Sequence, residues 1–206
     1  GLKLGGDRTL ILIDRSASML HREVVNIMRR RNMPEADQLR SVKWRQAVAS
    51  VDWLTSQFRP GSEFQMYMFN NTVEPVIVGS DGVWLKADDA TQLDEAIRRL
   101  RRTVPKNGTN MQAAYEVASK LTPRPDNIIL LVDGLPTMDA PETSKRTISG
   151  NERVKLHDRA RRELPRGIPV NVLLFPMEGD YDAAMKYWLL SYASGGSFMS
   201  ISKDWP

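Results

Sequence analysis

The chain has 206 residues, of which 41% are hydrophobic and 26% charged, with a formal net charge of +4 and no cysteine. This length predicts a single domain that buries about 70% of the surface of its unfolded chain. The lack of cysteine excludes disulfides and cysteine nucleophiles, and two histidines are too few for a multi-histidine metal site. The small positive charge does not indicate nucleic-acid binding, and no apolar run is long enough to span a membrane.

Apolar runs typical of buried strands alternate with helical stretches. We predict strands at 9–14, 64–69, 127–133, 168–175 and 197–202, and an edge strand at 72–78, which contains Pro75. Residues 70–72 fit the turn of a hairpin between two of these strands. The alternation indicates an α/β fold: a three-layer, doubly wound and mostly parallel central sheet with one antiparallel edge strand and helices on both faces.

Apolar residues spaced three and four apart predict helices at 38–58, 90–102, 110–121 and 180–193, and a basic helix lies near 150–163. In the helix at 180–193 the spacing assigns one set of residues to the core: Tyr181, Ala184, Met185, Trp188, Leu189 and Tyr192. The two histidines, His21 and His157, are expected at the surface or on a helix face.

Two stretches look like insertions into this plan, at 20–37 and 135–150. The first carries Arg22 and Arg29–Arg31, and it also has apolar residues at helical spacing: Val24, Val25, Ile27 and Met28. We predict a short helix there, with its apolar side inward and its arginines toward an acidic partner. The second stretch is polar, and we expect it to be mobile.

Polar residues follow the strands at the edge where ligands bind in open parallel sheets. One edge collects two carboxylates and three hydroxyls, from Asp14, Ser16, Ser18, Thr109 and Asp133. Oxygen-only ligation suits a hard cation, and so few carboxylates favour Mg²⁺, with Mn²⁺ or Ca²⁺ as alternatives. If the carboxylates act through water, the ion touches only neutral hydroxyls and stays electrophilic. Its natural further ligand is then an Asp or Glu carboxylate from a partner protein.

Three segments carry a family resemblance: D-x-S-x-S at 14–18, the G-T-N loop at 108–110 and VDGLP at 132–136. They are similar to the metal-ion-dependent adhesion site of von Willebrand factor type A domains, and strand and helix order fits along the whole chain. The resemblance implies that Ser16, Ser18 and Thr109 touch the metal directly, whereas Asp14 and Asp133 usually act through water or move into direct contact with the metal when a ligand binds. It also implies a non-enzymatic, adhesion- or scaffold-type protein-binding module.

The chain departs from this family in three ways. Ala17 stands where the family often has glycine, and Arg15 lies inside the motif, where it can influence partner choice. About eighteen residues also separate the motif from the first long helix, which normally follows soon after it.

Other interpretations stay open. Asp14, Ser16, Ser18 and Thr109 are also common helix caps, and Asp133 before glycine also fits a turn. One alternative function is a metal-independent structural or assembly subunit that docks through the 20–37 insertion. Another is a phosphoryl-transfer enzyme with Asp14 as nucleophile. Such enzymes generally carry a second aspartate two residues later, where this chain has Ser16.

The sequence gives only an expectation about the cellular compartment of this domain. Similar domains occur in extracellular adhesion proteins, in the extracytoplasmic parts of membrane-anchored bacterial proteins, and inside cells beside ring ATPases. A chain that starts at Gly1 without Met and ends just after its last predicted strand favours a trimmed, tethered extracytoplasmic domain.

Overall fold

The computed structural model describes residues 2, 5–139, 148–202 and 204–206. These residues form a seven-stranded sheet in the order β3-β2-β1-β5-β6-β7, with β4 also paired to β2. The strands are β1 Arg8–Asp14, β2 Glu63–Phe69, β3 Val73–Pro75, β4 Leu85–Lys86, β5 Asn127–Val132, β6 Val170–Leu174 and β7 Phe198–Ser200. The helices are α1 Val24–Arg30, α2 Glu35–Gln38, α3 Val42–Thr55, α4 Ala90–Arg102, α5 Met111–Lys120, α6 Gly150–Ala160 and α7 Ala183–Ser194. Short 3-10 turns are η1 Ala17–Leu20 and η2 Arg161–Glu163.

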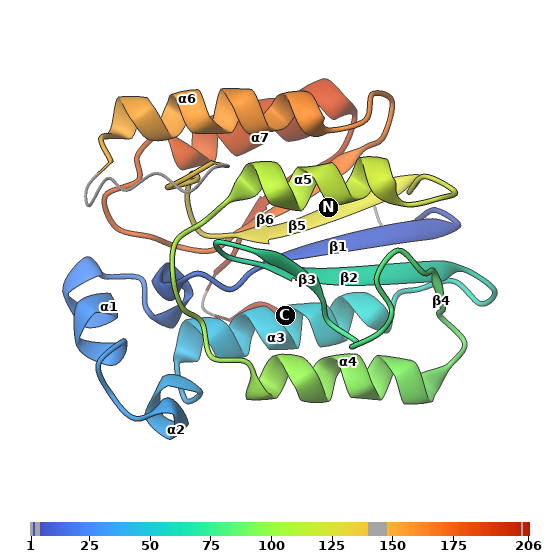
Figure 1. The fold of residues 1–206 in the computed structure, drawn as a ribbon, viewed down its shortest axis with the longest axis horizontal. Helices are drawn as coiled ribbons and strands as arrows, with labels where there is room; N and C mark the ends of the chain where they lie inside the picture. The colour runs from blue at the N-terminus through green and yellow to red at the C-terminus, as the bar shows by residue number, and fades with distance from the viewer. Residues whose placement is uncertain (1, 3–4, 140–147, 203) are drawn as a thin grey trace.

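The predicted parallel sheet with an antiparallel edge is confirmed (Figure 1). Strand β1 pairs in parallel with β2 and β5, so that Ile11 lies opposite Met66 on one side and Ile129 on the other. β3 pairs antiparallel with β2 across the predicted turn at 70–72, but it spans only Val73–Pro75 of the predicted 72–78. The two-residue strand β4 was not predicted, because so short a segment has no detectable alternation.

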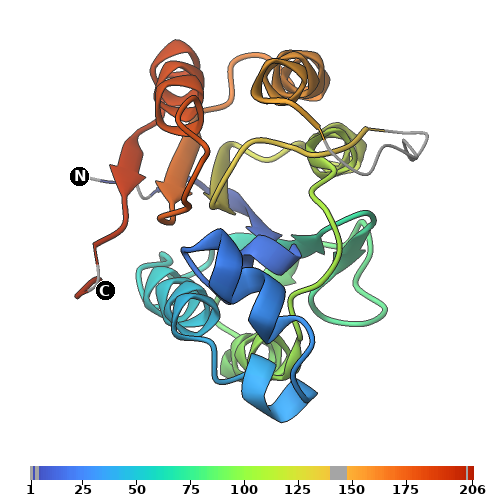
Figure 2. The same cartoon turned by 90° about the vertical axis from the view of Figure 1, so that its left-hand side faces the viewer.

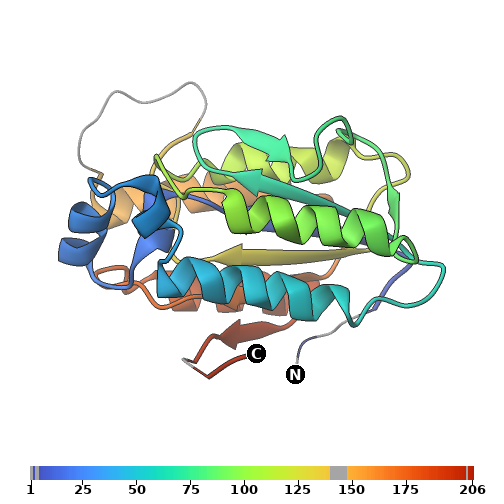
Figure 3. The same cartoon turned by 90° about the horizontal axis from the view of Figure 1, so that it is seen from below.

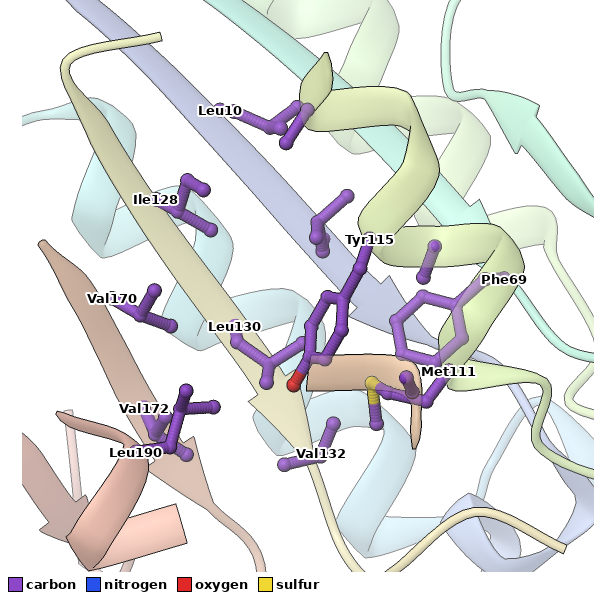
Figure 4. Close-up of a cluster of buried hydrophobic side chains, with 14 of the residues drawn as sticks. Leu10, Phe69, Met111, Tyr115, Ile128, Leu130, Val132, Val170, Val172 and Leu190 are labelled. Atoms are coloured by element: carbon purple, nitrogen blue, oxygen red, sulfur yellow. The ribbon is translucent and has the colours of Figure 1, made fainter. Parts of the chain in front are cut away.

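Side chains of each strand alternate between two hydrophobic cores, one on each face of the sheet. Leu10 and Leu12 face the layer of α5, α6 and α7, where Tyr115, Met111 and Leu130 belong to the same buried cluster (Figure 4). The intervening residues of β1 face α3 and α4, which cover the other face (Figure 3). This burial on both faces is why the strands are apolar almost throughout.

The predicted apolar faces of α4 and α5 are confirmed, but that of α7 is wrong. Tyr181, Met185, Trp188, Leu189 and Tyr192 are exposed, with Tyr192 at 75%. The buried face of α7 instead consists of Ala183, Tyr187, Leu190 and Ser191. Because apolar residues lie all round this helix, spacing alone did not identify the face that packs on the sheet.

The first insertion contains α1 and α2 at the carboxyl edge of the sheet, ahead of α3 (Figure 2). The predicted short helix is present as α1, but its predicted apolar burial is wrong. Only Ile27 is buried, while Val24, Val25 and Met28 are 45%, 78% and 53% exposed. The first long helix, α3, begins at Val42 rather than at 38, and Val42 itself is 74% exposed.

The remaining expectations concern the second insertion and the histidines. Residues 140–147 lie outside the described residues, but Leu135 and Met138 at the start of the stretch are buried. His157 is on a helix face, but that face is buried: the residue is 1% exposed, on α6 against the ring of Tyr187. None of the described helices combines the length and apolar content that a membrane crossing requires.

Candidate metal centre

Asp14, Ser16 and Ser18 lie where β1 ends at the carboxyl edge of the sheet. Asp14 is the last residue of β1 and is fully buried, and its Oδ1 accepts a hydrogen bond from the backbone N–H of Ser16 at 2.7 Å. The next residue, Ala17, begins η1, which turns the chain and brings the hydroxyls of Ser16 and Ser18 within 2.8 Å of each other. The motif is therefore a tight loop with its oxygen atoms gathered together.

Asp133 joins this cluster because its strand is the direct neighbour of β1. It follows the last residue of β5, which pairs in parallel with β1, so both strands end at the same edge. The hydroxyl of Ser18 donates to Asp133 Oδ1 at 2.9 Å. The structure thus brings together the two motif segments that the sequence placed 115 positions apart.

Thr109 reaches the cluster from the loop between α4 and α5. Its hydroxyl lies 3.4 Å from Asp14 Oδ2, and its backbone N–H donates to Thr137 Oγ1 at 2.9 Å. The N–H of Thr137 returns a hydrogen bond to the Thr109 carbonyl at 3.0 Å. Gly108 permits this approach, because a Cβ there would lie 2.8 Å from Thr137 Oγ1.

The five predicted residues therefore lie in one cluster, and its chemistry fits a hard divalent cation. Asp14, Ser16, Thr109 and Asp133 are all at most 4% exposed. Burial, reinforced by the charge of Asp133, raises the pKa of Asp14 to about 7, so the ionised form of this carboxyl is costly in the metal-free domain and would be favoured by a bound cation. Among the described residues, no group of three or more His, Cys, Asp or Glu could hold a metal, so hydroxyls would have to complete any site.

One site residue was missed by the sequence analysis. Lys43, in the first turn of α3, is 6% exposed, and its Nζ lies 2.5 Å from Asp133 Oδ2. The ammonium also donates to the carbonyl oxygens of Ser18 and His21, at 3.1 and 3.3 Å. A single lysine in a helix carries no motif signal, and only the fold places it at this edge.

A second group of missed residues supports the loop after Asp133. The hydroxyl of Tyr187 donates to the Gly134 carbonyl at 2.8 Å, and Asp180 Oδ2 accepts from the Leu135 N–H at 2.6 Å. Arg153 holds Asp180 in an ion pair at 2.7 Å. Gly134 leaves room for these contacts, since a Cβ there would lie 2.6 Å from Asp180 Oδ2.

The surroundings of the cluster differ in part from expectation. Arg15 does border the motif, but its guanidinium pairs with Glu74 at 3.0 Å, so its charge is already partly balanced. The insertion is fixed beside the edge by Glu178, whose carboxylate accepts from the Val24 N–H at 3.0 Å. An open groove of about 430 Å³, lined in part by His21, Val42 and Pro176, lies between this insertion and α3.

Fold and cluster together define an α/β domain with an oxygen-rich site at the carboxyl edge of its sheet. A family model described as von Willebrand factor type A domain matches residues 9–135, more than half of the chain. The chain belongs to the von Willebrand factor type A domain family. No curated protein matches it.

Solved structures share the fold at low sequence identity. A von Willebrand factor type A protein from Catenulispora acidiphila has a TM-score of 0.63 at 17% identity over 95% of this chain, which covers 38% of that protein. The vWF domain of the type V pili tip protein Mfa5 from Porphyromonas gingivalis has a TM-score of 0.62 at 11% identity, covering 95% of this chain and 89% of that one. Proximal thread matrix protein 1 from the mussel byssus, "with zinc occupied MIDAS motif", has a TM-score of 0.51 at 13% identity. The match covers 94% of this chain and 43% of that one.

Proposed function

We propose that this domain binds a Mg²⁺-type ion through Ser16, Ser18 and Thr109, with Asp14 and Asp133 held through water. The bound ion would supply a Lewis-acid centre that accepts an Asp or Glu carboxylate of a partner protein. The observation that carries the proposal is the convergence of the five oxygen-bearing side chains, linked by the hydrogen bonds from Ser18 to Asp133 and from Thr109 to Asp14. The zinc-occupied motif of the byssus protein supports the choice of site, since that protein has the same fold.

The proposed role is capture rather than catalysis. Ser16 stands where an aspartyl phosphoryl-transfer enzyme generally has its acid–base residue. Asp14, the nucleophile that the phosphoryl-transfer alternative requires, is fully buried and accepts hydrogen bonds from Ser16 and Thr109. Adhesion- or scaffold-type binding of a protein remains the function that this donor set serves best.

The test measures metal and carboxylate binding separately. Calorimetric titration with Mn²⁺ and with Mg²⁺ should give one ion per wild-type domain and none for Ser16→Ala or Asp14→Ala. Ser56→Ala, at an exposed hydroxyl after α3, is the matched control and should bind like the wild type. A Mg²⁺-dependent partner recovered from native extract by the wild type, and lost with chelator or with Ser16→Ala, should present an essential Asp or Glu. Equal titrations for wild type and Ser16→Ala would contradict the proposal.

A second candidate function rests on the insertion. The exposed apolar residues of α1, namely Val24, Val25 and Met28, favour docking of a protein onto this helix without any metal. Partner capture that survives chelator but is lost in Val25→Asp would support this metal-independent assembly role over the metal-dependent one.

A further inference from the structure

Lys43 places a positive charge inside the candidate metal centre. Its side chain is 5% exposed, and its ammonium has three acceptors: Asp133 Oδ2 and the carbonyl oxygens of Ser18 and His21. Three acceptors match the three N–H groups of an ammonium, so this is a fully satisfied buried cation. It is not a surface side chain that solvent would screen.

The contacts of Asp133 show how this cation acts on the cluster. One carboxylate oxygen, Oδ2, accepts from Lys43, while the other, Oδ1, accepts from the hydroxyl of Ser18. Both oxygens of the candidate donor are therefore engaged. An arriving divalent ion would have to share Asp133 with a fixed ammonium, whose charge has the same sign as its own.

No other basic group among the described residues has an ion pair with one of the five candidate donors. Arg15 pairs with Glu74, and Arg153 pairs with Asp180. With both carboxylates ionised, the state that a bound cation favours, Asp14, Asp133 and Lys43 together carry one net negative charge. A divalent ion would convert this to one net positive charge in a buried setting, which disfavours the ion alone and favours the ion together with an anion.

We propose that Lys43 is a built-in competing cation that weakens the affinity of the domain for a divalent ion and couples ion binding to the carboxylate of the partner. This inference rests on the proposed function, and it adds that Lys43 and the carboxylate of the partner together control the affinity for the ion. The free domain holds the ion weakly, and the carboxylate ligand raises ion affinity because it neutralises the excess positive charge. By linkage, the ion raises carboxylate affinity by the same factor.

The experiment titrates Mn²⁺ into the full chain by calorimetry, in acetate and in chloride at equal ionic strength. Lys43→Met removes the charge and keeps an apolar stem of similar length. Lys43→Arg keeps the charge, and Lys155→Met removes an exposed lysine charge from α6 as the matched control.

Lys43→Met should bind Mn²⁺ roughly tenfold more tightly than the wild type in chloride, and it should gain less from acetate. Lys43→Arg and Lys155→Met should keep the wild-type Mn²⁺ affinity and the wild-type rise in that affinity from chloride to acetate. A purely structural lysine would not change the size of the acetate gain. In the absence of metal, Lys43→Met should melt at a lower temperature, because Asp133 loses its partner, and Mn²⁺ should raise its melting temperature more than that of the wild type.

The possible failures separate the two proposals. Equal Mn²⁺ affinity and equal acetate gain in wild type and Lys43→Met would overturn the role of Lys43 and leave the metal site standing. No Mn²⁺ binding by either protein, in chloride or acetate, would overturn the proposed function and this inference with it. If Lys43→Met does not fold, Lys43→Gln, which removes the charge and keeps a polar group at the end of the side chain, replaces it in the same titrations with the same expected results.

Discussion

The hydroxyl of Tyr187 on α7 donates a hydrogen bond to the carbonyl oxygen of Gly134, the residue next to Asp133, at 2.8 Å. Tyr187 is fully buried, so this bond forms away from water. It links the helical layer on one face of the sheet to the loop that carries a candidate metal donor. Asp180, just ahead of the same helix, holds Leu135 in the same loop. The position of Asp133 therefore depends on residues outside the motif.

Tyr187→Phe should weaken this support. It leaves the Gly134 carbonyl without that donor, which should lower the free energy of unfolding by about 1–2 kcal/mol. It should also reduce Mn²⁺ affinity several-fold, because the Asp133 loop gains freedom. Chemical denaturation and calorimetry measure the two effects. Tyr192→Phe, on the same helix but 75% exposed, should change neither, and a Tyr187→Phe protein with wild-type stability and affinity would contradict this role.

Asp14→Asn should stabilise the metal-free domain while abolishing metal binding. Burial and the charge of Asp133 raise the pKa of Asp14 from 3.8 to about 7, so stability is lost as the pH rises through this range, and the full cost of the ionised form is present above about pH 7. The neutral amide removes this cost, and at about pH 8 we expect a rise in melting temperature of a few degrees, corresponding to roughly 1–2 kcal/mol.

Thermal melts with and without Mg²⁺ check the Asp14→Asn prediction. The ion should raise the melting temperature of the wild type and leave that of the variant unchanged. Asp94→Asn, at an exposed carboxylate on α4, is the control and should behave as wild type. A lower melting temperature for metal-free Asp14→Asn would show that its hydrogen bonds to Ser16 and Thr109 outweigh the charge effect.

The central sheet could be predicted from sequence because its strands are apolar almost throughout. In β1, every residue from Thr9 to Asp14 is buried, and the four residues from Leu10 to Ile13 form the uninterrupted apolar run that the sequence displays. In α7, by contrast, Tyr187 and Leu190 face the core while Trp188 and Leu189 face outward. Both sides of this helix are apolar, so the choice of face is made by packing and not by a pattern in the chain.

The candidate site likewise contains residues that the sequence could predict and one that only the packing of the fold places there. Asp14, Ser16 and Ser18 lie within five residues, and parallel strands had to bring Asp133 to the same edge, so a motif and a sheet topology were enough to predict the cluster. Lys43 lies 90 positions from Asp133 in sequence, in the first turn of α3 and outside any motif. Its contact with Asp133 follows only from tertiary structure.

The contribution of His157 to the stability of the domain should fall below neutral pH, opposite in sign to that of Asp14. Burial lowers the pKa of this histidine below its ordinary value of 6.5, so it is neutral in the folded domain at pH 7. Below about 6.5 the unfolded chain takes up the proton more readily than the folded one, and stability is lost as the pH falls. His157→Phe retains an aromatic ring against Tyr187 and should lose less stability between about pH 7 and about pH 5 than the wild type. Denaturant titrations at both pH values measure this difference, and equal losses would contradict it.

The arginines of the insertion should set the rate and selectivity of partner binding rather than metal affinity. Arg29 and Arg31 are exposed on and just after α1, at the carboxyl edge that also holds the candidate metal centre (Figure 2). Rim charges act mainly through long-range attraction, which salt screens. The double variant Arg29→Glu/Arg31→Glu should therefore bind an acidic partner about tenfold more weakly at low salt, lose most of the salt dependence, and keep wild-type Mn²⁺ affinity.

Surface plasmon resonance with the Mg²⁺-dependent partner, across a salt series, measures the affinity and its salt dependence. Arg124→Glu/Arg162→Glu makes the same change in net charge at exposed positions elsewhere and should have little effect. Equal binding by the wild type and the insertion variant at low salt would show that these arginines form only a solvated face.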